Sequence, residues 1–296
     1  STNIKERHDH STAITNSDGK LIAQAENALP AHLASMGGLI QHVLDEYKDN
    51  INDGDIFIAN DPHVAGGTHL PDINMAMPVF NKGTLLGFVA NIVHHADVGG
   101  AAVGSMSGGL NEIYKEGLRI PLVRLYNKGK IVKDIQRLLL LNMRLPDERK
   151  GDLNAQISAC RLGVKRIQEL LSKHGASYLN TAFEEILKRS KLRMQKAISK
   201  LPDGNYTFTD YMDDDGLNTK NIKISVDIKK KGKKILFDFS KTDGQVDGNF
   251  NLTFNATQSS VCYSLKALLD PELPNNSGIF DAIDIKVPKG SLLNCV

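Results

Sequence analysis

The sequence contains no tryptophan and only three cysteines among its 296 residues. Cys160, Cys262 and Cys295 are far apart and odd in number, which excludes a disulfide scaffold and a cysteine-rich zinc site. So few thiols without a pairing pattern are typical of a protein from a reducing compartment. We therefore expect a cytoplasmic protein.

Charge of one sign and long apolar runs are also missing. Lys and Arg number 36 against 34 for Asp and Glu, and this near balance argues against nucleic acid as a partner. No stretch approaches the roughly 18 apolar residues that a membrane span needs, and the polar segment Ser1–His10 has no signal-peptide pattern. We therefore expect a globular protein that binds neither nucleic acid nor a membrane.

Three common motifs of nucleotide binding and catalysis are absent as well. The sequence has no Gly-x-x-x-x-Gly-Lys-Ser/Thr, no Gly-x-Gly-x-x-Gly after a predicted strand and no Gly-x-Ser-x-Gly. We therefore predict that this chain does not hold ATP in either of these phosphate-binding loops.

Periodicity divides the chain into three blocks, which we take as domains: residues 1–131 are strand-like, 132–201 helical and 202–296 β-rich. The predicted strands are Thr12–Thr15, Leu21–Ala25, Asp55–Ala59, Met75–Phe80, Leu85–His94, Ile222–Ile228, Ile235–Phe239 and Ile279–Val287. The predicted helices are Ser35–Lys48, Val132–Asn142, Asp147–His174, Ser177–Lys200 and Thr257–Leu269. This pattern predicts an α+β fold, with mixed sheets in the N-terminal half, a long helical pair in the middle and a β-rich C-terminal part.

Both ends of the sequence are abrupt. Ser1–Ile4 has the character of the middle of an element, and Ser291–Val296 has no closing cap. We therefore expect a fragment of a larger polypeptide, with the block 202–296 incomplete at its C-terminus.

Histidine and aspartate recur together in two glycine-rich segments of the first block. His69 and Asp72 form one His-x-x-Asp pattern, and His94 with Asp97 forms the second. Neutral imidazole and carboxylate are usual ligands of Zn²⁺, Mn²⁺ and Fe²⁺, and they need no thiolate. The spacing therefore indicates a candidate metal site in this block.

The two neighbouring histidines of the second segment should point in opposite directions. Because Leu85–His94 is predicted to be a strand, His94 and His95 alternate between its faces. One imidazole then binds the ion, while the other contacts a ligand or the substrate.

Plainer interpretations exist for each of these residues. A single His-x-x-Asp is common and most often makes a surface hydrogen bond. The remaining histidines, His8, His10, His32, His42 and His174, are expected to be structural or exposed, with His32 capping a helix. Cys160 fits a helix core, Glu112 and Glu116 fit either a cleft or a solvated helix face, and Lys229–Lys234 fits a solvated turn.

Several separated motifs, in this order, resemble the hydantoinase B family. They are Asn3–Ser11, Asn60–His63, Gly66–Asp72, His94–Gly100, Gly104–Met106, Glu116–Pro121, Asn142–Arg144, Gly151–Gln156, Asp238–Ser240 and Gly248–Asn251. That family includes the B-type chain of N-methylhydantoinase, the C-terminal part of 5-oxoprolinase, and the large subunits of acetone and acetophenone carboxylases. The resemblance covers essentially the whole chain.

The resemblance implies a division of labour between two subunits. A hydantoinase A-type partner, with an acetate-kinase-like ATP site, phosphorylates the substrate's amide or enolate oxygen. The B-type subunit then completes ring opening or carboxylation at a divalent metal ion. The resemblance implies a metal site made by His69, Asp72 and His94, with Asp9 as the fourth ligand.

Further residues are assigned roles around that site. His95 or Asp97 is expected to move the proton, and His63, Gly99 and Gly100 are expected to contact the substrate. The sequence departs from the family pattern at both ends, since members begin earlier and continue past Val296. His10 also replaces a residue that is more usually aromatic, so it could add a ligand or a contact.

The leading hypothesis is therefore a hetero-oligomeric, ATP-dependent hydrolase of a cyclic amide such as hydantoin or 5-oxoproline. An acetone-carboxylase-like subunit, which joins an activated ketone to CO₂, is the alternative within the same fold. A non-catalytic scaffold, whose His and Asp residues only cap loops, is the alternative from another class.

Overall fold

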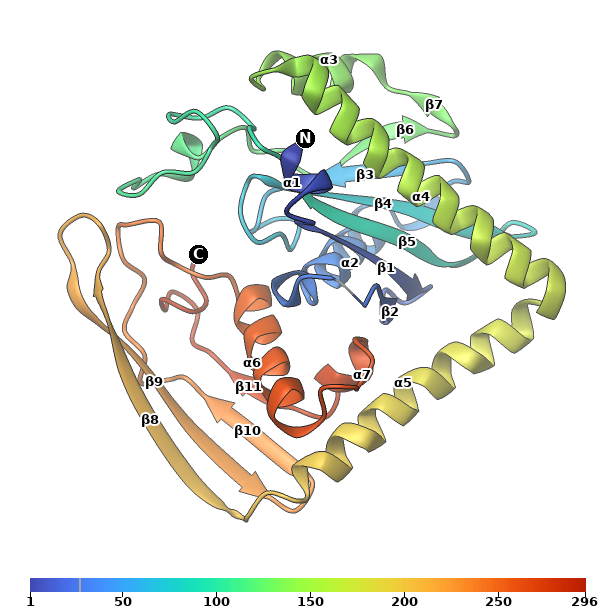
Figure 1. Cartoon of the computed structure of the whole chain (residues 1–296). Helices are drawn as coiled ribbons and strands as arrows, with labels where there is room; N and C mark the ends of the chain where they lie inside the picture. The colour runs from blue at the N-terminus through green and yellow to red at the C-terminus, as the bar shows by residue number, and fades with distance from the viewer. Residues whose placement is uncertain (27) are drawn as a thin grey trace.

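A seven-stranded sheet organises the first half of the chain (Figure 1). The computed structural model describes residues 1–26 and 28–296. The strands lie in the order β2 (Leu21–Gln24), β1 (His10–Asn16), β5 (Thr84–His94), β4 (Asp72–Asn81), β3 (Ile56–Ala59), β6 (Val123–Asn127) and β7 (Lys130–Ile131). Neighbouring strands in this sheet are antiparallel. The strands predicted at residues 12–15 and 21–25 are confirmed as β1 and β2, which form an antiparallel hairpin.

Helices cover both faces of this sheet. On one face, α2 (Ser35–Tyr47) packs against Phe57 and Phe88, and on the other, α4 (Pro146–His174) packs against Ile58 and Met75. Strands buried on both faces need apolar residues at successive positions. This explains why β4 and β5 are almost continuously apolar and show little alternation.

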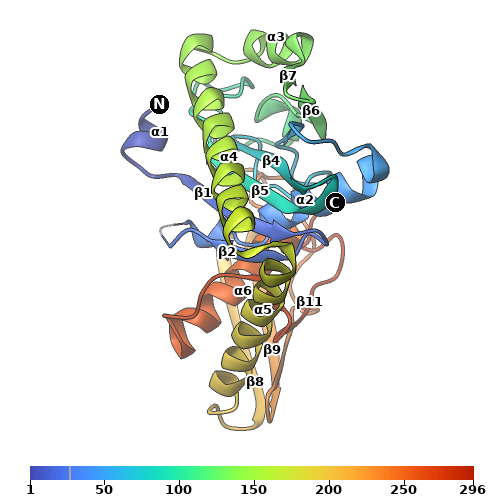
Figure 2. The same cartoon turned by 90° about the vertical axis from the view of Figure 1, so that its right-hand side faces the viewer.

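Three helices follow the first sheet in the chain, and two of them, α4 and α5 (Ala176–Ile198), lead from it to the second half of the molecule (Figure 2). The first of the three is α3 (Lys133–Leu141), and all three confirm predicted helices. The chain turns at Gly175, where φ is +80°, a value that glycine adopts without strain. Cys160 is fully buried on α4, as predicted for a core residue. No helix among the described residues is both long enough and apolar enough to cross a lipid bilayer.

A second sheet of four strands follows the long helices. Its order is β11 (Asp284–Lys286), β10 (Lys234–Asp238), β9 (Lys220–Lys231) and β8 (Gly204–Asp214). The β10–β11 pair is parallel, and the others are antiparallel. The α+β class is confirmed, and the mixed pairing that we expect in the first half lies in this second sheet instead.

One further long helix, α6 (Phe254–Leu269), and five short ones complete the described chain: α1 (Thr2–Lys5), η1 (Pro30–His32), η2 (Lys48–Asn50), η3 (Ile113–Lys115) and α7 (Ser277–Phe280). Helix α6 confirms the prediction for residues 257–269 and packs on η1 and α2. The largest buried cluster includes Met36 and Phe88 from the first block and Leu265 and Ile283 from the third. These two blocks therefore share one apolar core.

Three local predictions are wrong in whole or in part. The predicted strand Ile279–Val287 is confirmed over β11 (Asp284–Lys286), but its first two residues lie in α7, because Asn276 caps that helix by accepting the backbone N–H of Gly278 (3.0 Å). Glu112 and Glu116 lie on either side of η3 and share no helix face. In the basic turn, Lys230 is 5% exposed, because its ammonium group donates to Asp203 Oδ1 (2.6 Å).

The two glycines of α4 allow a matched test of its packing on the sheet. A Cβ atom at Gly163 would lie 2.6 Å from a methyl group of Val89, whereas one at Gly151 would meet nothing within 4 Å. We expect Gly151→Ala to raise the free energy of unfolding by about 1 kcal/mol, because alanine favours helix. Gly163→Ala should lower it by about 1–2 kcal/mol through overpacking. Urea unfolding followed by circular dichroism measures both, and equal effects would contradict this packing.

Candidate metal centre

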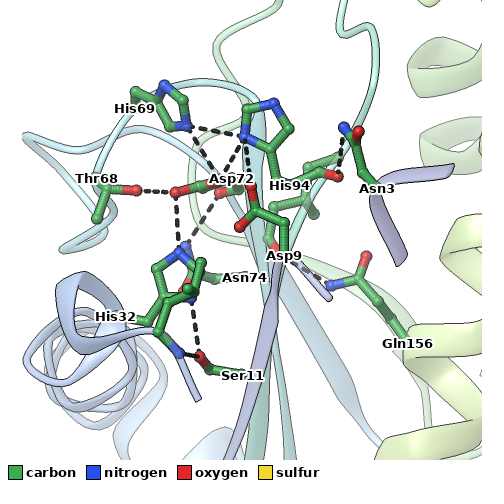
Figure 3. A network of polar contacts seen from close by, with 12 residues as sticks. Asn3, Asp9, Ser11, His32, Thr68, His69, Asp72, Asn74, His94 and Gln156 are labelled. Atoms are coloured by element: carbon green, nitrogen blue, oxygen red, sulfur yellow. Dashed lines mark hydrogen bonds and ion pairs between the residues drawn. The ribbon is translucent and has the colours of Figure 1, made fainter. Parts of the chain in front are cut away.

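One end of the seven-stranded sheet brings the four predicted metal ligands together (Figure 3). Asp72 begins β4 and His94 ends β5, and these residues are direct cross-strand partners. Directly opposed residues point to the same face of a sheet. Asp9 immediately precedes β1, and its carbonyl oxygen accepts the backbone N–H of His94 (3.0 Å). His69 lies in the loop before β4, and its carbonyl accepts the N–H of Asp72 (3.0 Å).

The side-chain atoms of three of these residues form a nearly regular triangle. Asp72 Oδ1 lies 3.1 Å from His69 Nε2 and 3.1 Å from His94 Nδ1, and the two ring nitrogens are 3.1 Å apart. Asp9 Oδ2 lies 3.9 Å from His94 Nδ1. Atoms that each bind one ion at about 2.0–2.2 Å lie about 3.0–3.4 Å from one another. The two imidazoles and the carboxylate therefore fit a first-row divalent ion.

Charge at this centre is concentrated on one buried carboxylate. Burial raises the pKa of Asp72, but hydrogen bonds from His32, His69 and His94 outweigh it and hold that pKa well below the ordinary value. Burial lowers the pKa of His69, yet the hydrogen bond and the charge of Asp72 raise it above the ordinary value overall. A buried anion that attracts positive charge from several directions suits a cation.

The second oxygen of Asp72 has two further partners, neither of them among the predicted site residues. Thr68 Oγ1 donates a hydrogen bond to Oδ2, and His32 Nε2 lies 3.4 Å from the same atom. His32 is 2% exposed, and neither η1 nor the following helix α2 has a side-chain cap, so its interpretation as a helix cap is wrong. Its partner belongs to another element, and sequence spacing carries no sign of that contact. Thr68 stands inside the segment Gly66–Asp72 and could have been recognised there.

His95 does not join this cluster. Its ring lies on the opposite side of the chain from His94, as alternation predicts, and Nε2 is 2.8 Å from Gln156 Oε1 on α4. The ring is fully buried, and burial lowers the pKa of His95 to about 4, so the ring is neutral near pH 7. The proton-shuttle role of His95 stays a prediction, and its position gives that role no support.

Asp97 also lies outside the cluster and organises the glycine-rich loop that follows β5. Its two oxygens accept the backbone N–H groups of Gly99 (2.8 Å) and Gly104 (2.9 Å) and the Arg144 guanidinium (3.0 Å). Burial raises the pKa of Asp97, but these donors outweigh it and lower that pKa overall. Every donor belongs to the loop or to the residue that anchors it, which indicates a structural task.

Gly99 and Gly100 fulfil a steric requirement of this loop. Their φ angles are +91° and +84°, and a Cβ atom at either position would come within 2.5 Å of a backbone oxygen. Side chains are therefore excluded at both positions. The predicted contact of these glycines with substrate stays a prediction.

Two further residues with titratable side chains, Glu116 and His63, come from loops around the cluster. Burial raises the pKa of Glu116, although the charges of His69 and His63 and the backbone N–H of Leu70 oppose that rise. Glu116 is therefore close enough to His69 to interact with it electrostatically. It opens the Glu-Gly-Leu-Arg-Ile-Pro motif, which could have identified it as a site residue. His63 is exposed, and its predicted contact with substrate stays a prediction.

His10 lies beside the cluster without joining it. Its Nδ1 is 3.2 Å from the carbonyl oxygen of His8, and the side chain belongs to neither candidate set of metal ligands among the described residues. Of the two roles expected for His10, the structure therefore does not support that of an added metal ligand.

Two loops next to the cluster are fixed by one asparagine at the end of β3. Asn60 Nδ2 donates to the carbonyl oxygens of Leu70 (2.7 Å) and Leu118 (2.9 Å), and its Oδ1 accepts the N–H of Ile120 (2.6 Å). Asn60 is fully buried. These hydrogen bonds therefore fix the positions of the loops that carry His69 and Glu116 relative to each other.

Known proteins resemble this chain over nearly its whole length. A 5-oxoprolinase of Dictyostelium discoideum is 34% identical over 99% of this chain and 23% of its own length. An uncharacterized protein of Methanocaldococcus jannaschii is 40% identical over 99% of this chain and 52% of its own. The beta chain of a caprolactamase of Pseudomonas jessenii is 31% identical over 97% of this chain and 49% of its own. The chain thus spans between about a quarter and about half of these relatives.

Solved structures share the fold. The crystal structure of the ATP-dependent caprolactamase from Pseudomonas jessenii matches with a TM-score of 0.90 at 31% identity, over 98% of this chain and 50% of that one. A nucleotide-free acetone carboxylase matches with a TM-score of 0.92 at 20% identity, over 99% of this chain and 40% of that one, which supports the fold alone. The family model described as hydantoinase B/oxoprolinase matches residues 1–296, and this chain therefore belongs to the hydantoinase B/oxoprolinase family.

Proposed function

We propose that this chain is the metal-binding, B-type part of an ATP-dependent hydrolase that opens cyclic amides. The single observation that carries the proposal is the 3.1 Å triangle of His69 Nε2, His94 Nδ1 and Asp72 Oδ1 at the end of the sheet. Relatives named 5-oxoprolinase and caprolactamase supply the reaction class. Both names denote enzymes of cyclic amides.

The ion would be held by His69, Asp72 and His94, with Asp9 as a fourth ligand. When bound, a Zn²⁺, Mn²⁺ or Fe²⁺ ion supplies Lewis acidity and eases the ionisation of water near pH 7. Asp72 provides the buried negative charge that retains a cation. His69, whose side chain is 36% exposed, forms the face that the substrate can reach.

An amide ring needs activation because resonance makes its carbonyl carbon a poor electrophile. Phosphorylation of the amide oxygen would make that carbon a better electrophile. Addition of water and cleavage of the C–N bond would then open the ring to an acyl phosphate, and a second water molecule would release the phosphate and leave the free acid. This chain has neither of the two phosphate-loop motifs sought in its sequence, so we assign ATP and the phosphorylation step to a hydantoinase A-type partner. The caprolactamase relative is named as a beta chain, which supports such a hetero-oligomer.

Glu116 is the residue we assign to proton transfer. It is close enough to His69 to interact with it electrostatically, and burial raises its pKa above the ordinary value, which makes its carboxylate a better proton acceptor. Our sequence-based candidates face other groups: His95 directs Nε2 to Gln156 on α4, away from the cluster, and Asp97 accepts hydrogen bonds from the glycine-rich loop. Glu116 therefore replaces them as the leading candidate.

Two other functions would give different products. A carboxylase of the acetone carboxylase type would incorporate label from ¹³C-bicarbonate, whereas the hydrolase would release a ring-opened acid without label. The likeness to acetone carboxylase rests on fold at 20% identity, so the hydrolase is preferred. A scaffold without catalysis would contain no stoichiometric metal ion.

Removal of one imidazole tests the metal centre. We expect His69→Ala to reduce bound metal from about one ion per chain to less than a tenth of that. Ring opening, assayed with the A-type partner, ATP and 5-oxoproline or caprolactam, should be lost in parallel. Elemental analysis and product chromatography measure the two effects, and His174→Ala, at an exposed helix end, is the control. Unchanged metal content and turnover would remove this site from the proposal.

Removal of the Glu116 carboxylate tests the proton-transfer assignment. We expect Glu116→Gln to lower the ring-opening rate by about 100-fold, because general base catalysis contributes on that scale, with metal content unchanged. Glu112→Gln, at an exposed position four residues earlier, should leave the rate unchanged. Full turnover of Glu116→Gln would show that another group takes the proton.

The structural task of Asp97 leads to a separate stability prediction. We expect Asp97→Asn to lower the free energy of unfolding by about 2–3 kcal/mol at pH 7, since it weakens several charge-assisted hydrogen bonds. A lowered pKa means that this stabilisation is complete above the ordinary carboxyl pKa of about 3.9 and is lost only as pH falls through the lowered value. Urea midpoints at pH 7 and pH 5 should therefore show the same deficit. Asp53→Asn, at an exposed site, is the control, and a stable Asp97→Asn protein with lost turnover would restore the catalytic role.

A further inference from the structure

The two oxygens of Asp72 face different environments. Oδ1 faces the ring nitrogens of His69 and His94, while Oδ2 faces Thr68 and His32. A carboxylate that binds an ion through one oxygen has to be prevented from turning. The groups around Oδ2 therefore decide which oxygen is offered to the ion.

His32 is linked to Asp72 at one ring nitrogen and to Ser11 at the other. Nε2 lies 3.4 Å from Asp72 Oδ2, and Nδ1 lies 2.9 Å from Ser11 Oγ. Ser11 Oγ also accepts the backbone N–H of Leu29 (3.1 Å), which leaves its own hydrogen free to be donated to Nδ1. In a neutral ring the proton then sits on Nε2, the nitrogen nearer the Asp72 carboxylate. Figure 3 shows this line from β1 to the cluster.

The surroundings hold the ring in this orientation. His32 is 2% exposed and Ser11 is 2% exposed, so water does not compete for either contact. The short helix η1 that carries His32 begins at Pro30, and the N–H of Ala34 just beyond it donates to Ser259 Oγ on α6 (3.0 Å). The His32 ring is therefore held by contacts with Ser11 on β1 and Asp72 on β4, and the backbone next to it is held by Ser259 on α6.

We propose that His32, oriented by Ser11, is a positioning residue that fixes the Asp72 carboxylate so that Oδ1 faces the metal ion. This inference rests on the proposed function, because it presumes an ion at His69, Asp72 and His94. Thr68 shares the task by donating to the same oxygen, Oδ2. Loss of these donors would free the carboxylate to rotate and would weaken the site without removing a ligand.

A second ion between His32, Asp9 and Asp72 is the competing interpretation. The ligand atoms of that set lie within 4.8 Å of one another, whereas those of the first set are 3.1 Å apart. Both nitrogens of His32 are already engaged, and Oδ2 already accepts the Thr68 hydroxyl. These contacts favour the positioning role.

Titration of the purified chain with Zn²⁺ alone, against a competing chelator, tests the proposal. We expect His32→Leu to bind Zn²⁺ about 10–100-fold more weakly than the unsubstituted chain, still at one ion per chain. His32→Gln, whose amide can donate to Oδ2, should bind within about threefold of the unsubstituted chain. The urea midpoint of each metal-free variant shows whether the fold is retained, and Ser11→Ala, expected to bind about threefold more weakly or worse, provides a milder substitution if His32→Leu fails to fold.

The outcomes separate the two proposals. If His69→Ala abolishes Zn²⁺ binding while folded His32→Leu, or Ser11→Ala in its place, binds as tightly as the unsubstituted chain, the positioning role is wrong and the metal centre stands. If His69→Ala binds Zn²⁺ normally, the metal centre itself is wrong. Two ions per unsubstituted chain, with one lost in His32→Leu, would replace positioning by ligation. Weak binding by His32→Leu with rescue by His32→Gln supports the proposal.

Discussion

The pairing of Asp72 on β4 with His94 on β5 is the contact on which the rest of the site depends. Backbone hydrogen bonds between the two strands fix the separation of the paired side chains. This separation therefore does not depend on the conformation of the loops. The other groups then approach this fixed pair: Asp9 from the start of β1 and His69 from the loop before β4. The carboxylate is buried and paired on several sides, which is the condition for keeping a charge inside a protein.

The surrounding helices and loops keep the end of the sheet that carries the site rigid. Helices on both faces bury the strands that carry Asp72 and His94, so their ends have little freedom to move. Asn60 fixes the neighbouring loops, and Asp97 with Arg144 closes the glycine-rich segment after β5. A site of this kind is preorganised by groups that never contact a ligand.

Local spacing in the sequence is enough to predict some of the site. His69 and Asp72 are three residues apart, and the alternation of a strand separates His94 from His95, so these relations are predictable. The contact of His32 with Asp72 is not, because it joins η1 to β4 and leaves no periodic sign. Glu116 is missed for a related reason: its spacing from Glu112 suggests a helix, but the chain there forms only one short 3₁₀ turn. The elements themselves are largely predictable, since long apolar patterns determine them, whereas α7 depends on one capping side chain.

The backbone hydrogen bond from His94 to Asp9 joins the first residues of the chain to the end of β5, and both residues also face the candidate ion. An ion bound there would cross-link parts of the sheet that are distant in the sequence. Its free energy of binding would then be shared with the free energy of folding, because the unfolded chain cannot assemble such a set of donors. Removal of such an ion would therefore lower the free energy of unfolding, in addition to any effect at the site itself.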